Sequence, residues 1–278
     1  MNDSFITALN TQKATVSWMD VLSENLSNVY TPGFKENQVN FQTFLGGAIM
    51  DNPNKNLGQG KSIPGTSSSN LFLEGRGYFL VKNSEGKNIY TRHGEFTFDK
   101  EGVYKNKDGS TVQGYILNDK GEIMQGTSAL NSDLYQQTTA QGGAMNIPTT
   151  SIKLWLDPNN GKYLGKYDDY EIKGDGIMYG KADKGQKVVP LYKIATMDFQ
   201  NASGLYEIKQ GQFIETEDSG SPVIGRAEVR SGLLEMSNVD FKDNIGYFQQ
   251  AKVQMELTNK LISSNKQLLE EALKLVGS

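Results

Sequence analysis

The stretch that decides the fold is SNVDFKDNIGYFQQAKVQMELTNKLISSNKQLLEEALKLVGS, residues 237–278. Its apolar residues recur every seven positions, which predicts a long amphipathic helix with a coiled-coil-like partner. The first apolar row consists of Phe248, Met255, Ile262, Leu269 and Val276. A second row, one position earlier, consists of Leu261, Leu268 and Leu275. Because a buried Leu or Ile contributes roughly 1.5–3 kcal/mol, these rows need another helix to cover them.

Small or polar residues accompany the first apolar row, three positions after four of its members. They are Ala251, Thr258, Asn265 and Ala272. Short side chains at this spacing let a neighbouring helix approach closely. We expect Ser237 or Asn238 to cap the start of this helix, and Gly277 lies near its end.

A second amphipathic helix is predicted over residues 1–30. Its apolar positions, separated by steps of three and four residues or their sums, are Phe5, Leu9, Val16, Met19, Leu26 and Val29. The helix should end near Tyr30, because Thr31-Pro32-Gly33 follows, where a proline and a glycine both disfavour helix. The two helices can be surface helices packed on one globular core. Their position at both termini and the heptad spacing of the second favour self-assembly.

From Leu71 onward the pattern changes to short apolar runs that predict β-strands. Turn sequences such as Ser84-Glu85-Gly86 and Lys107-Asp108-Gly109 separate the runs. The strands are expected near 71–73, 78–81, 89–91, 96–98, 102–104, 112–117, 151–156, 170–173, 176–179, 188–199, 206–208 and 222–229. The predicted fold class is therefore mainly β with terminal α-helices. An antiparallel β-domain is flanked by N- and C-terminal amphipathic helices that form a coiled-coil-like core domain.

The same patterns predict three regions in the chain. Residues 1–35 and 231–278 form a helical core domain for assembly. Residues 36–70 form a linker segment with little periodicity. Residues 71–230 form a β-rich outer domain with an insertion at about 120–180, which begins with a stretch rich in Gln, Ser, Thr and Gly.

Composition narrows the possible partners. The net charge is −4 and no Lys/Arg run occurs, so we expect no nucleic acid partner. Cysteine is absent, which excludes disulfides and thiolate metal sites. The start, MNDSFITALNTQK, lacks the pattern of a secretory signal peptide. Since the apolar runs are far shorter than the ~18 residues of a membrane span, no membrane insertion is expected.

The sequence predicts no enzyme, no cofactor, no metal and no catalytic residue. His93 is the only histidine and has no nucleophile motif around it. Gly75-x-Gly77 lacks the third glycine of a dinucleotide-binding fingerprint. The segment 157–161 with Asp168 departs from a calcium loop in its glycine and proline positions. Ser263 and Lys266 match a hydrolase motif by spacing alone.

Four stretches together resemble the family of bacterial flagellar rod and hook proteins. They are LSENLSNVYTPGFK (22–35), LFLEGRGYFLV (71–81), YTRHGEF (90–96) and SGLLEMSNVD (231–240). They occur in the family's order and at fitting distances. The last helix departs from the family's usual sequence at residues 250–260, and 120–180 matches nothing specific. Within the family, the resemblance leans to a proximal rod protein over a distal one.

The resemblance implies a structural axial subunit of the flagellar basal-body rod that polymerises into a helical tube and transmits torque. It implies export through the flagellar type III apparatus without a cleaved signal. Its partners would be further copies of itself and other axial proteins of the rod and hook. The assembly interface is predicted to contain Leu9, Val16, Met19, Leu26, Asn28, Pro32, Gly33, Phe34, Phe248, Met255, Ile262, Leu269 and Val276. Asn25, Asn28, Pro32, Gly33 and Phe34 would form the turn between helix and β-domain.

Three other functions stay open at this point. The chain can be a hook protein, or a secreted β-domain adhesin whose terminal coiled coils make a discrete oligomer. A carbohydrate-active enzyme would need paired carboxylates in a cleft, for which Glu215, Glu217 and Asp218 are the candidates. For the axial protein we expect termini that are largely disordered in the monomer, since isolated helices are marginally stable in water.

Overall fold

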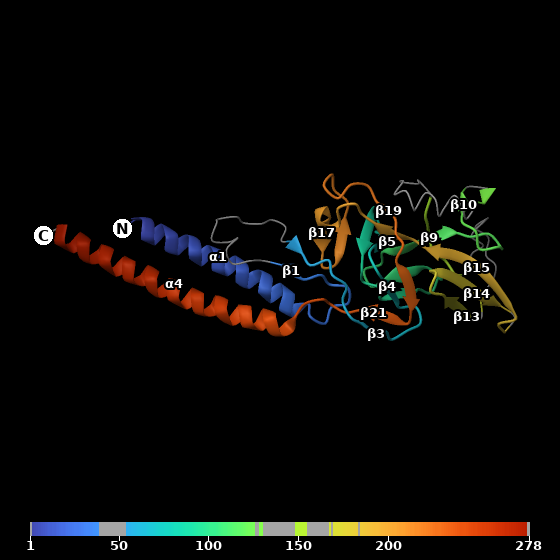
Figure 1. Cartoon of the computed structure of the whole chain (residues 1–278), viewed down its shortest axis with the longest axis horizontal. Coiled ribbons are helices and arrows are strands. Elements are labelled where there is room, and N and C mark those ends of the chain that lie inside the picture. The colour runs from blue at the N-terminus through green and yellow to red at the C-terminus, as the bar shows by residue number, and fades with distance from the viewer. Residues whose placement is uncertain are drawn as a thin grey trace. The chain divides into compact units, whose positions relative to one another are not determined.

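The computed structural model describes residues 2–38, 54–125, 128–129, 148–154, 167, 169–182 and 184–276. It divides into two compact units (Figure 1). The helical unit contains Met1–Tyr30, Lys35–Asn56 and Asn238–Ser278. The β unit contains Thr31–Phe34 and Leu57–Ser237. Each unit thus combines segments that are far apart in the sequence.

Two long helices form the helical unit and lie side by side in Figure 1. Helix α1 spans Asn2–Ser27 and helix α4 spans Phe241–Val276. They run antiparallel, because Gln12 bonds Asn259 whereas Asn25 bonds Asn244. That the isolated subunit has largely disordered termini stays a prediction.

The start of α4 corrects the predicted cap. The helix begins at Phe241, and the carboxylate of Asp240 accepts a hydrogen bond of 3.0 Å from the backbone N–H of Asp243. Asp240 is therefore the N-cap, not Ser237 or Asn238. The Asn238 side chain instead bonds residues outside α4. Its Oδ1 accepts from the backbone N–H of Glu36, and its Nδ2 donates to the Asn56 carbonyl.

The interface between α1 and α4 has a small apolar core. Ala14, Trp18 and Leu22 of α1 pack with Ala251 of α4, and Phe248 borders them. Ala251 is fully buried and Thr258, one heptad later, is 5% exposed. Of the predicted small residues, these two therefore line the seam along which the helices approach each other.

The strands of the β unit pair antiparallel. The main sheet has the order β13-β14-β15-β9-β5-β6-β18-β17, with β7, β8, β12, β16 and β19 paired beside this path. The smaller pairs are β20 with β4 and β21 with β3, while β1 pairs with β2 and β10 with β11. The bounds are β1 Asn37–Gln38, β2 Asn54–Lys55, β3 Ser62–Pro64, β4 Leu71–Glu74, β5 Tyr78–Lys82, β6 Asn88–Thr91, β7 Phe96–Phe98, β8 Tyr104–Asn106, β9 Thr111–Ile116, β10 Met124–Gln125, β11 Ser128–Ala129, β12 Thr150–Ser151, β13 Asp169–Ile172, β14 Ile177–Ala182, β15 Lys187–Ile194, β16 Thr196–Asp198, β17 Tyr206–Lys209, β18 Gln212–Ile214, β19 Val223–Ile224, β20 Glu228–Ser231 and β21 Leu233–Glu235.

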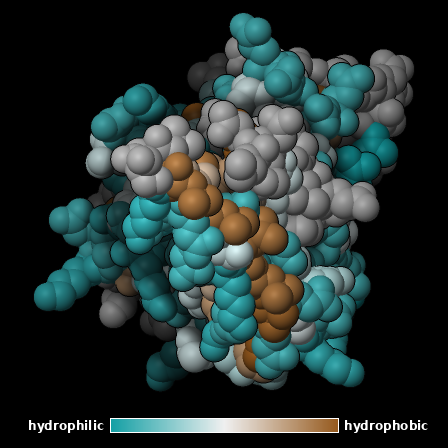
Figure 2. Space-filling model, turned by 90° about the vertical axis from the view of Figure 1, so that its left-hand side faces the viewer, coloured by the Kyte–Doolittle hydropathy of each residue, from teal (hydrophilic) through white to brown (hydrophobic). Residues whose placement is uncertain are grey.

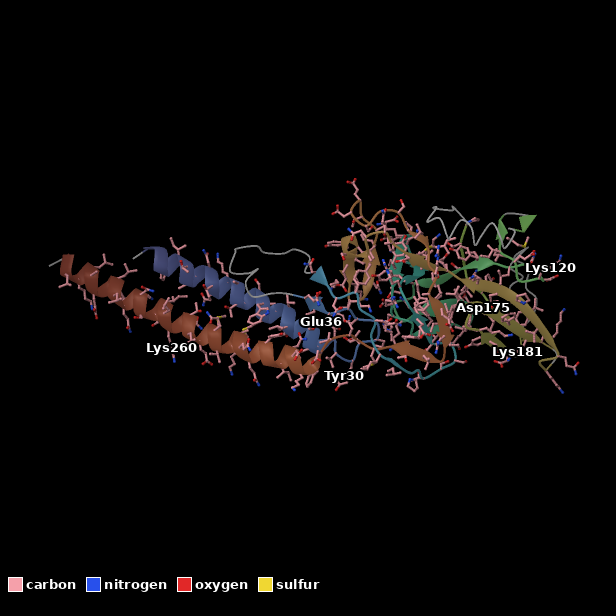
Figure 3. The ribbon with its side chains drawn as sticks, in the orientation of Figure 1. Tyr30, Glu36, Lys120, Asp175, Lys181 and Lys260 are labelled. Carbon is pink, nitrogen blue, oxygen red and sulfur yellow. The ribbon has the colours of Figure 1, made fainter. Side chains whose placement is uncertain are left out.

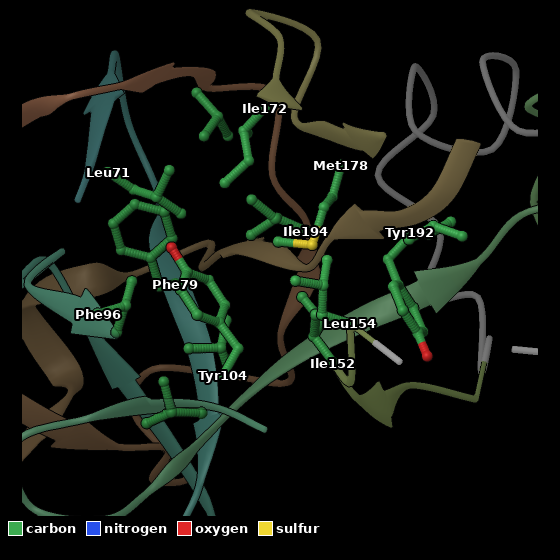
Figure 4. Close-up of a cluster of buried hydrophobic side chains, with 14 of the residues drawn as sticks. Leu71, Phe79, Phe96, Tyr104, Ile152, Leu154, Ile172, Met178, Tyr192 and Ile194 are labelled. Carbon is green, nitrogen blue, oxygen red and sulfur yellow. The ribbon is translucent and has the colours of Figure 1, made fainter. Parts of the chain in front are cut away.

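Strand β5 is buried on both of its faces. Phe79 and Val81 belong to one apolar cluster, which Figure 4 shows in part, and Tyr78 and Leu80 belong to a second. Successive side chains of a strand point to opposite faces, so a strand covered on both sides needs an unbroken apolar run. This explains why Tyr78-Phe79-Leu80-Val81 is continuous and not alternating.

Of residues 120–180, predicted to form an insertion, several strands take part in the main sheet, while β10 and β11 pair only with each other. Strand β12 pairs with β9, and β13 and β14 extend the sheet beyond β15. Ile152 and Ile172 are buried in the first apolar cluster. Of the predicted linker 36–70, β1 and β2 pair with each other, and β3 pairs with β21. The three-region division itself stays a prediction.

Candidate assembly site

Buried asparagine side chains join α1 to α4 within the helical unit. The side-chain amide of Asn25 bonds both backbone groups of Asn37, as a neighbouring β-strand would. Its Nδ2 donates to the Asn37 carbonyl at 3.0 Å, and its Oδ1 accepts from the Asn37 N–H at 2.9 Å. The same Nδ2 also donates to Oδ1 of Asn244 on α4, at 3.0 Å. All three residues are at most 3% exposed. One side chain thus ties both helices to β1.

Glu36 continues this asparagine network along the same unit, and Figure 3 labels it beside the end of α1. Its carboxylate accepts from Nδ2 of Asn244 at 2.8 Å and from Nδ2 of Asn56 at 3.2 Å. Its backbone carbonyl accepts from the Asn56 N–H at 2.8 Å. A buried polar group that loses its partner costs about 1–3 kcal/mol, so the network specifies one register of α1 on α4.

The turn Thr31–Phe34 belongs to the β unit, although it follows α1 closely in the sequence. Gly33 has φ +71°, and a Cβ there would lie 2.6 Å from backbone atoms of Arg92 and His93. Its N–H donates to the Glu235 carbonyl at 2.8 Å. Phe34 is fully buried. Glycine is therefore required by both conformation and space.

A buried ion pair lies beside this turn. Nη1 of Arg92 is 3.1 Å from Oε2 of Glu235, and the two side chains are 5% and 1% exposed. Arg92 also donates to the carbonyls of Leu73 and Gly75, and Oε1 of Glu235 accepts from the Gly60 N–H. The pair holds β4 and β21 together with the segment before β3.

Tyr78 packs against this ion pair, with the Arg92 guanidinium 5.8 Å from its ring centre. Burial raises the pKa of Tyr78 to about 12, and the positive charge of Arg92 opposes that shift. The phenol therefore stays neutral at ordinary pH, and the ion pair carries the charge here.

An apolar strip on α4 is left exposed among polar and charged side chains. Figure 2 shows a band of brown side chains bordered by teal ones on the side that carries the helices. The large exposed apolar residues of α4 are Phe241, Tyr247, Val253, Leu257, Leu261, Leu268, Leu269, Leu273 and Leu275. Among them, Leu257, Leu261, Leu268 and Leu275 form a row at helical spacing, which we call the outer leucine row. Leu261 and Leu268 are 50% and 52% exposed.

Helix α4 also extends past α1, with 36 residues against 26. The hydrogen bonds Gln12–Asn259 and Asn25–Asn244 set the register. Both helices rise by the same distance per residue, so this antiparallel register places Asn2 of α1 beside Leu268 of α4. The last turns of α4 therefore have no α1 residue beside them in the described part of the chain.

The predicted interface residues fall into three groups. Met19 and Phe248 border the core between the helices. Leu9, Leu26, Met255 and Ile262 are half-buried, while Val16 and Leu269 are exposed, and Val276 ends α4. Asn28, Gly33 and Phe34 are buried and Pro32 is half-buried. Phe248, Met255 and Ile262 of the first apolar row are thus at least partly buried, and the second row supplies three of the four residues of the outer leucine row.

Several residues of the site could not be predicted from the sequence. Asn37, Asn244 and Glu36 complete the asparagine network, and Arg92 and Glu235 form the ion pair. Arg92 and Glu235 do lie inside stretches that resemble the family, YTRHGEF and SGLLEMSNVD. The resemblance of these stretches to the family could have drawn attention to both residues, but it does not indicate that they form an ion pair.

Two of the residues considered for chemistry, His93 and Glu215, have structural partners. His93 Nε2 lies 3.3 Å from Oε2 of Glu95. Burial acts to raise the pKa of Glu95, but hydrogen bonds from Lys107 and His93 outweigh it and lower the pKa. Glu215 accepts a hydrogen bond from the Tyr90 hydroxyl at 3.3 Å.

The described residues contain no cluster of three or more His, Cys, Asp or Glu side chains suited to a metal. The segment 157–161 and Asp168 lie outside the described residues. Within the described part of the chain, neither helix is apolar enough over a sufficient length to cross a membrane.

A model of the flagellar hook protein FlgE/F/G D1 domain matches residues 72–179. The flagellar basal-body rod protein FlgG of Bacillus subtilis is 26% identical over 287 residues, which covers 92% of each chain. The sequence is thus similar to flagellar rod and hook proteins over most of its length. Another relative, the flagellar hook protein FlgE of Borreliella burgdorferi, is 29% identical and covers 64% of this chain and 43% of that one.

A solved structure of Helicobacter pylori flagellar hook protein FlgE2 aligns with a TM-score of 0.41 and 11% identity, over 63% of this chain and all of that chain. The flagellar rod and hook proteins to which it is similar are structural proteins and not enzymes. Flagellar rod and hook proteins self-assemble with other axial flagellar proteins, in the basal body or hook.

Proposed function

We propose that this chain is a structural subunit of the flagellar basal-body rod, which polymerises into a helical tube and transmits torque. The similarity to the rod protein of Bacillus subtilis supports the rod, because it extends over 92% of both chains. The similarity to the hook protein of Borreliella burgdorferi covers 43% of that longer relative.

The observation that carries the proposal is the outer leucine row on α4. Burial of a leucine side chain stabilises a protein by roughly 1.5–3 kcal/mol. A neighbouring helix that packs on these four exposed leucines can supply that burial. An adjacent side of α4 already holds α1 through Ala251 and Thr258. A helix covered on one side by its own chain and on the other by a second subunit makes a heterologous contact, which continues into a filament when it does not close.

Torque transmission needs subunits that resist sliding. The asparagine network fixes α1 on α4, and the Arg92–Glu235 pair fixes the strands of the β unit. The predicted interface residues Leu9, Val16, Met19, Leu26, Phe248, Met255, Ile262, Leu269 and Val276 are proposed to support the helix pair and its contacts with neighbours. Asn28, Pro32, Gly33 and Phe34 are proposed to set the path of the chain after α1.

We further propose export through the flagellar type III apparatus, with the chain unfolded. Folding of the two helices onto each other would then follow export and precede or accompany polymerisation. A chain whose termini are only marginally stable before assembly suits this order.

A hook protein is the second candidate, favoured by the family model, which includes FlgE, and by the hook-protein relative. Deleting the gene in the native bacterium and examining basal bodies by electron microscopy separates the two. The rod proposal expects truncated rods without hooks. Complete rods that lack only the hook would favour the second candidate, and unaltered flagella would refute both.

A further inference from the structure

The side of α1 that faces away from α4 carries a row of residues at heptad spacing. Ala14, Trp18 and Leu22 pack on α4. About half a turn around α1 from them lies a row with alternate steps of three and four residues, Ile6, Leu9, Lys13, Val16 and Asp20. Leu9 is half-buried and the other four residues are exposed, Ile6 to 52% and Val16 to 40%. We call these five residues the back row of α1.

The outer leucine row of α4 has the same spacing once two polar residues are included. Ser264 and Glu271 follow Leu261 and Leu268 by three residues, and both are exposed. A second helix with this spacing can cover such a seam. The end of the seam lies beyond the level of Asn2, where α1 of the same chain begins. The α1 of the same chain therefore does not cover the whole seam.

One antiparallel register brings the apolar residues of the two rows together. Both helices rise by ~1.5 Å per residue, so a register that places Leu268 opposite Val16 also places Leu275 opposite Leu9. The two leucines of α4 are 52% and 80% exposed. This register includes the end of α4 that extends past its own α1, and it supplies the cover that one chain lacks.

The charges of the two rows match in this register as well. Glu271 lies between the two leucines of α4 and comes opposite Lys13 of α1. Both side chains are exposed, and neither forms an ion pair with another described residue. In its own chain Lys13 lies near the level of Leu257, about 21 Å along α4 from Glu271. The two charges can therefore meet only between copies.

The neighbouring registers fit less well. A shift by one heptad in one direction places Glu271 opposite Ile6, and a shift in the other direction places it opposite Asp20. The first buries a charge against an apolar side chain, and the second sets two carboxylates against each other. Because complementary charges fix the register of an interface, the Lys13–Glu271 alignment is the favoured one.

We propose that the back row of α1 in one copy of this chain packs antiparallel on the outer leucine row of α4 in the next copy. Lys13 of one copy then forms an ion pair with Glu271 of the neighbouring copy. This contact rests on the proposed function, and it specifies which helices join the subunits of that polymer.

The direction of the helices suits a polymer. Within one chain α1 and α4 run antiparallel, so α1 of one copy also runs antiparallel to α4 of a neighbour that points the same way. The contact is heterologous and can repeat without closing, whereas a twofold contact of α4 with α4 would close as a dimer. The two contacts of α4 lie about a third of a turn apart, so successive subunits follow a curved wall, as a tube requires.

Reversal of the two charges tests the contact in the full-length protein. Sedimentation velocity gives the concentration at which half of the subunits are in polymers. Lys13→Glu and Glu271→Lys each set like charges opposite each other, and each should raise this concentration at least about tenfold. The double variant restores an opposite pair at unchanged net charge and should restore polymerisation. The matched controls Lys252→Glu and Glu270→Lys change exposed charges of α4 outside the seam and should polymerise like the unmodified protein.

Disulfide formation locates the contact, since the chain has no cysteine of its own. After oxidation, a chain with both Val16→Cys and Leu268→Cys should give a ladder of covalently linked copies. Leu268→Cys alone should give no linked dimer. This pair keeps the test valid if a charge variant fails to fold.

The outcomes separate this contact from the proposed function. A dimer from Leu268→Cys alone would show that α4 packs on α4 and would overturn the contact. Unchanged polymerisation of Lys13→Glu and Glu271→Lys, or a folded double variant that does not recover, would overturn it while leaving polymerisation and the proposed function intact. Failure of the unmodified protein to polymerise would instead overturn the proposed function, and this contact with it.

Discussion

Strand β5 and helix α4 are both rich in apolar residues, yet they bury them differently. The side chains Tyr78, Phe79, Leu80 and Val81 of β5 are at most 4% exposed, because the β unit covers both faces of that strand. Helix α4 buries Ala251 against α1 and leaves Leu261 half exposed. The β unit thus covers both faces of β5 within one chain, whereas the exposed leucines of α4 are left for the contact that we propose with a neighbouring subunit.

The largest effect should come from breaking the buried ion pair that completes the β unit. Arg92→Met leaves Glu235 charged and buried, which should lower the free energy of unfolding by about 3–5 kcal/mol. Urea denaturation measures it. Arg76→Met is the control, because Arg76 is 77% exposed and lies 4.0 Å from Asp198, and it should cost less than ~1 kcal/mol. Equal stabilities of the two variants would contradict the structural role of the pair.

The next effect tests the asparagine network of the helical unit. Asn25→Ala removes bonds to Asn37 and Asn244, so we expect a loss of about 1–3 kcal/mol or more. Helix melting by circular dichroism reports it. Ser23→Ala, at an exposed position of the same helix, should stay within ~0.5 kcal/mol of the unmodified protein. If Asn25→Ala melts like Ser23→Ala, the network does not hold α1 on α4.

A substitution on the side of α4 that packs against α1 should lower the free energy of unfolding somewhat less than Asn25→Ala does. Ala251→Leu places a larger side chain in the fully buried seam, which should cost about 1–3 kcal/mol by overpacking. Val253→Leu adds apolar volume at an exposed position two residues away and should be nearly neutral. Helix melting of the two variants side by side would show the asymmetry, and its absence would mean that α1 does not pack at Ala251.

Much of the fold could be predicted because its signals are local. The heptad rows predicted α4, and the run Tyr78-Phe79-Leu80-Val81 predicted β5. The expected turns at Gly86 and Gly109 have φ +78° and +83°, which glycine adopts readily. Strand β18 was missed, because Gln212-Phe213-Ile214 carries one buried apolar residue and too short a pattern.

The site was harder to predict because its partners are distant in sequence. Asn25 meets Asn244 across 219 residues, and Arg92 meets Glu235 across 143. Polar residues show no periodicity that would pair them, so their burial appears only in the folded chain. The N-cap was wrong for a related reason: Asn238 is used by Glu36 and Asn56, and Asp240 remains to cap α4.

Substitutions on the exposed side of α4 should have the smallest effect on the stability of the folded subunit and the largest effect on its assembly. Leu261→Gln combined with Leu268→Gln alters two half-exposed side chains, so the free energy of unfolding should change by less than ~1 kcal/mol. Lys260→Gln with Lys266→Gln, both exposed positions of the same helix, is the matched control.

The most direct test is sedimentation velocity of these two double variants beside the unmodified protein, under conditions in which the latter polymerises. We expect polymers from the unmodified protein and the lysine variant, and folded monomers from the leucine variant. Polymers of unchanged length and stability from the leucine variant would contradict the central claim that α4 is completed by a neighbouring subunit.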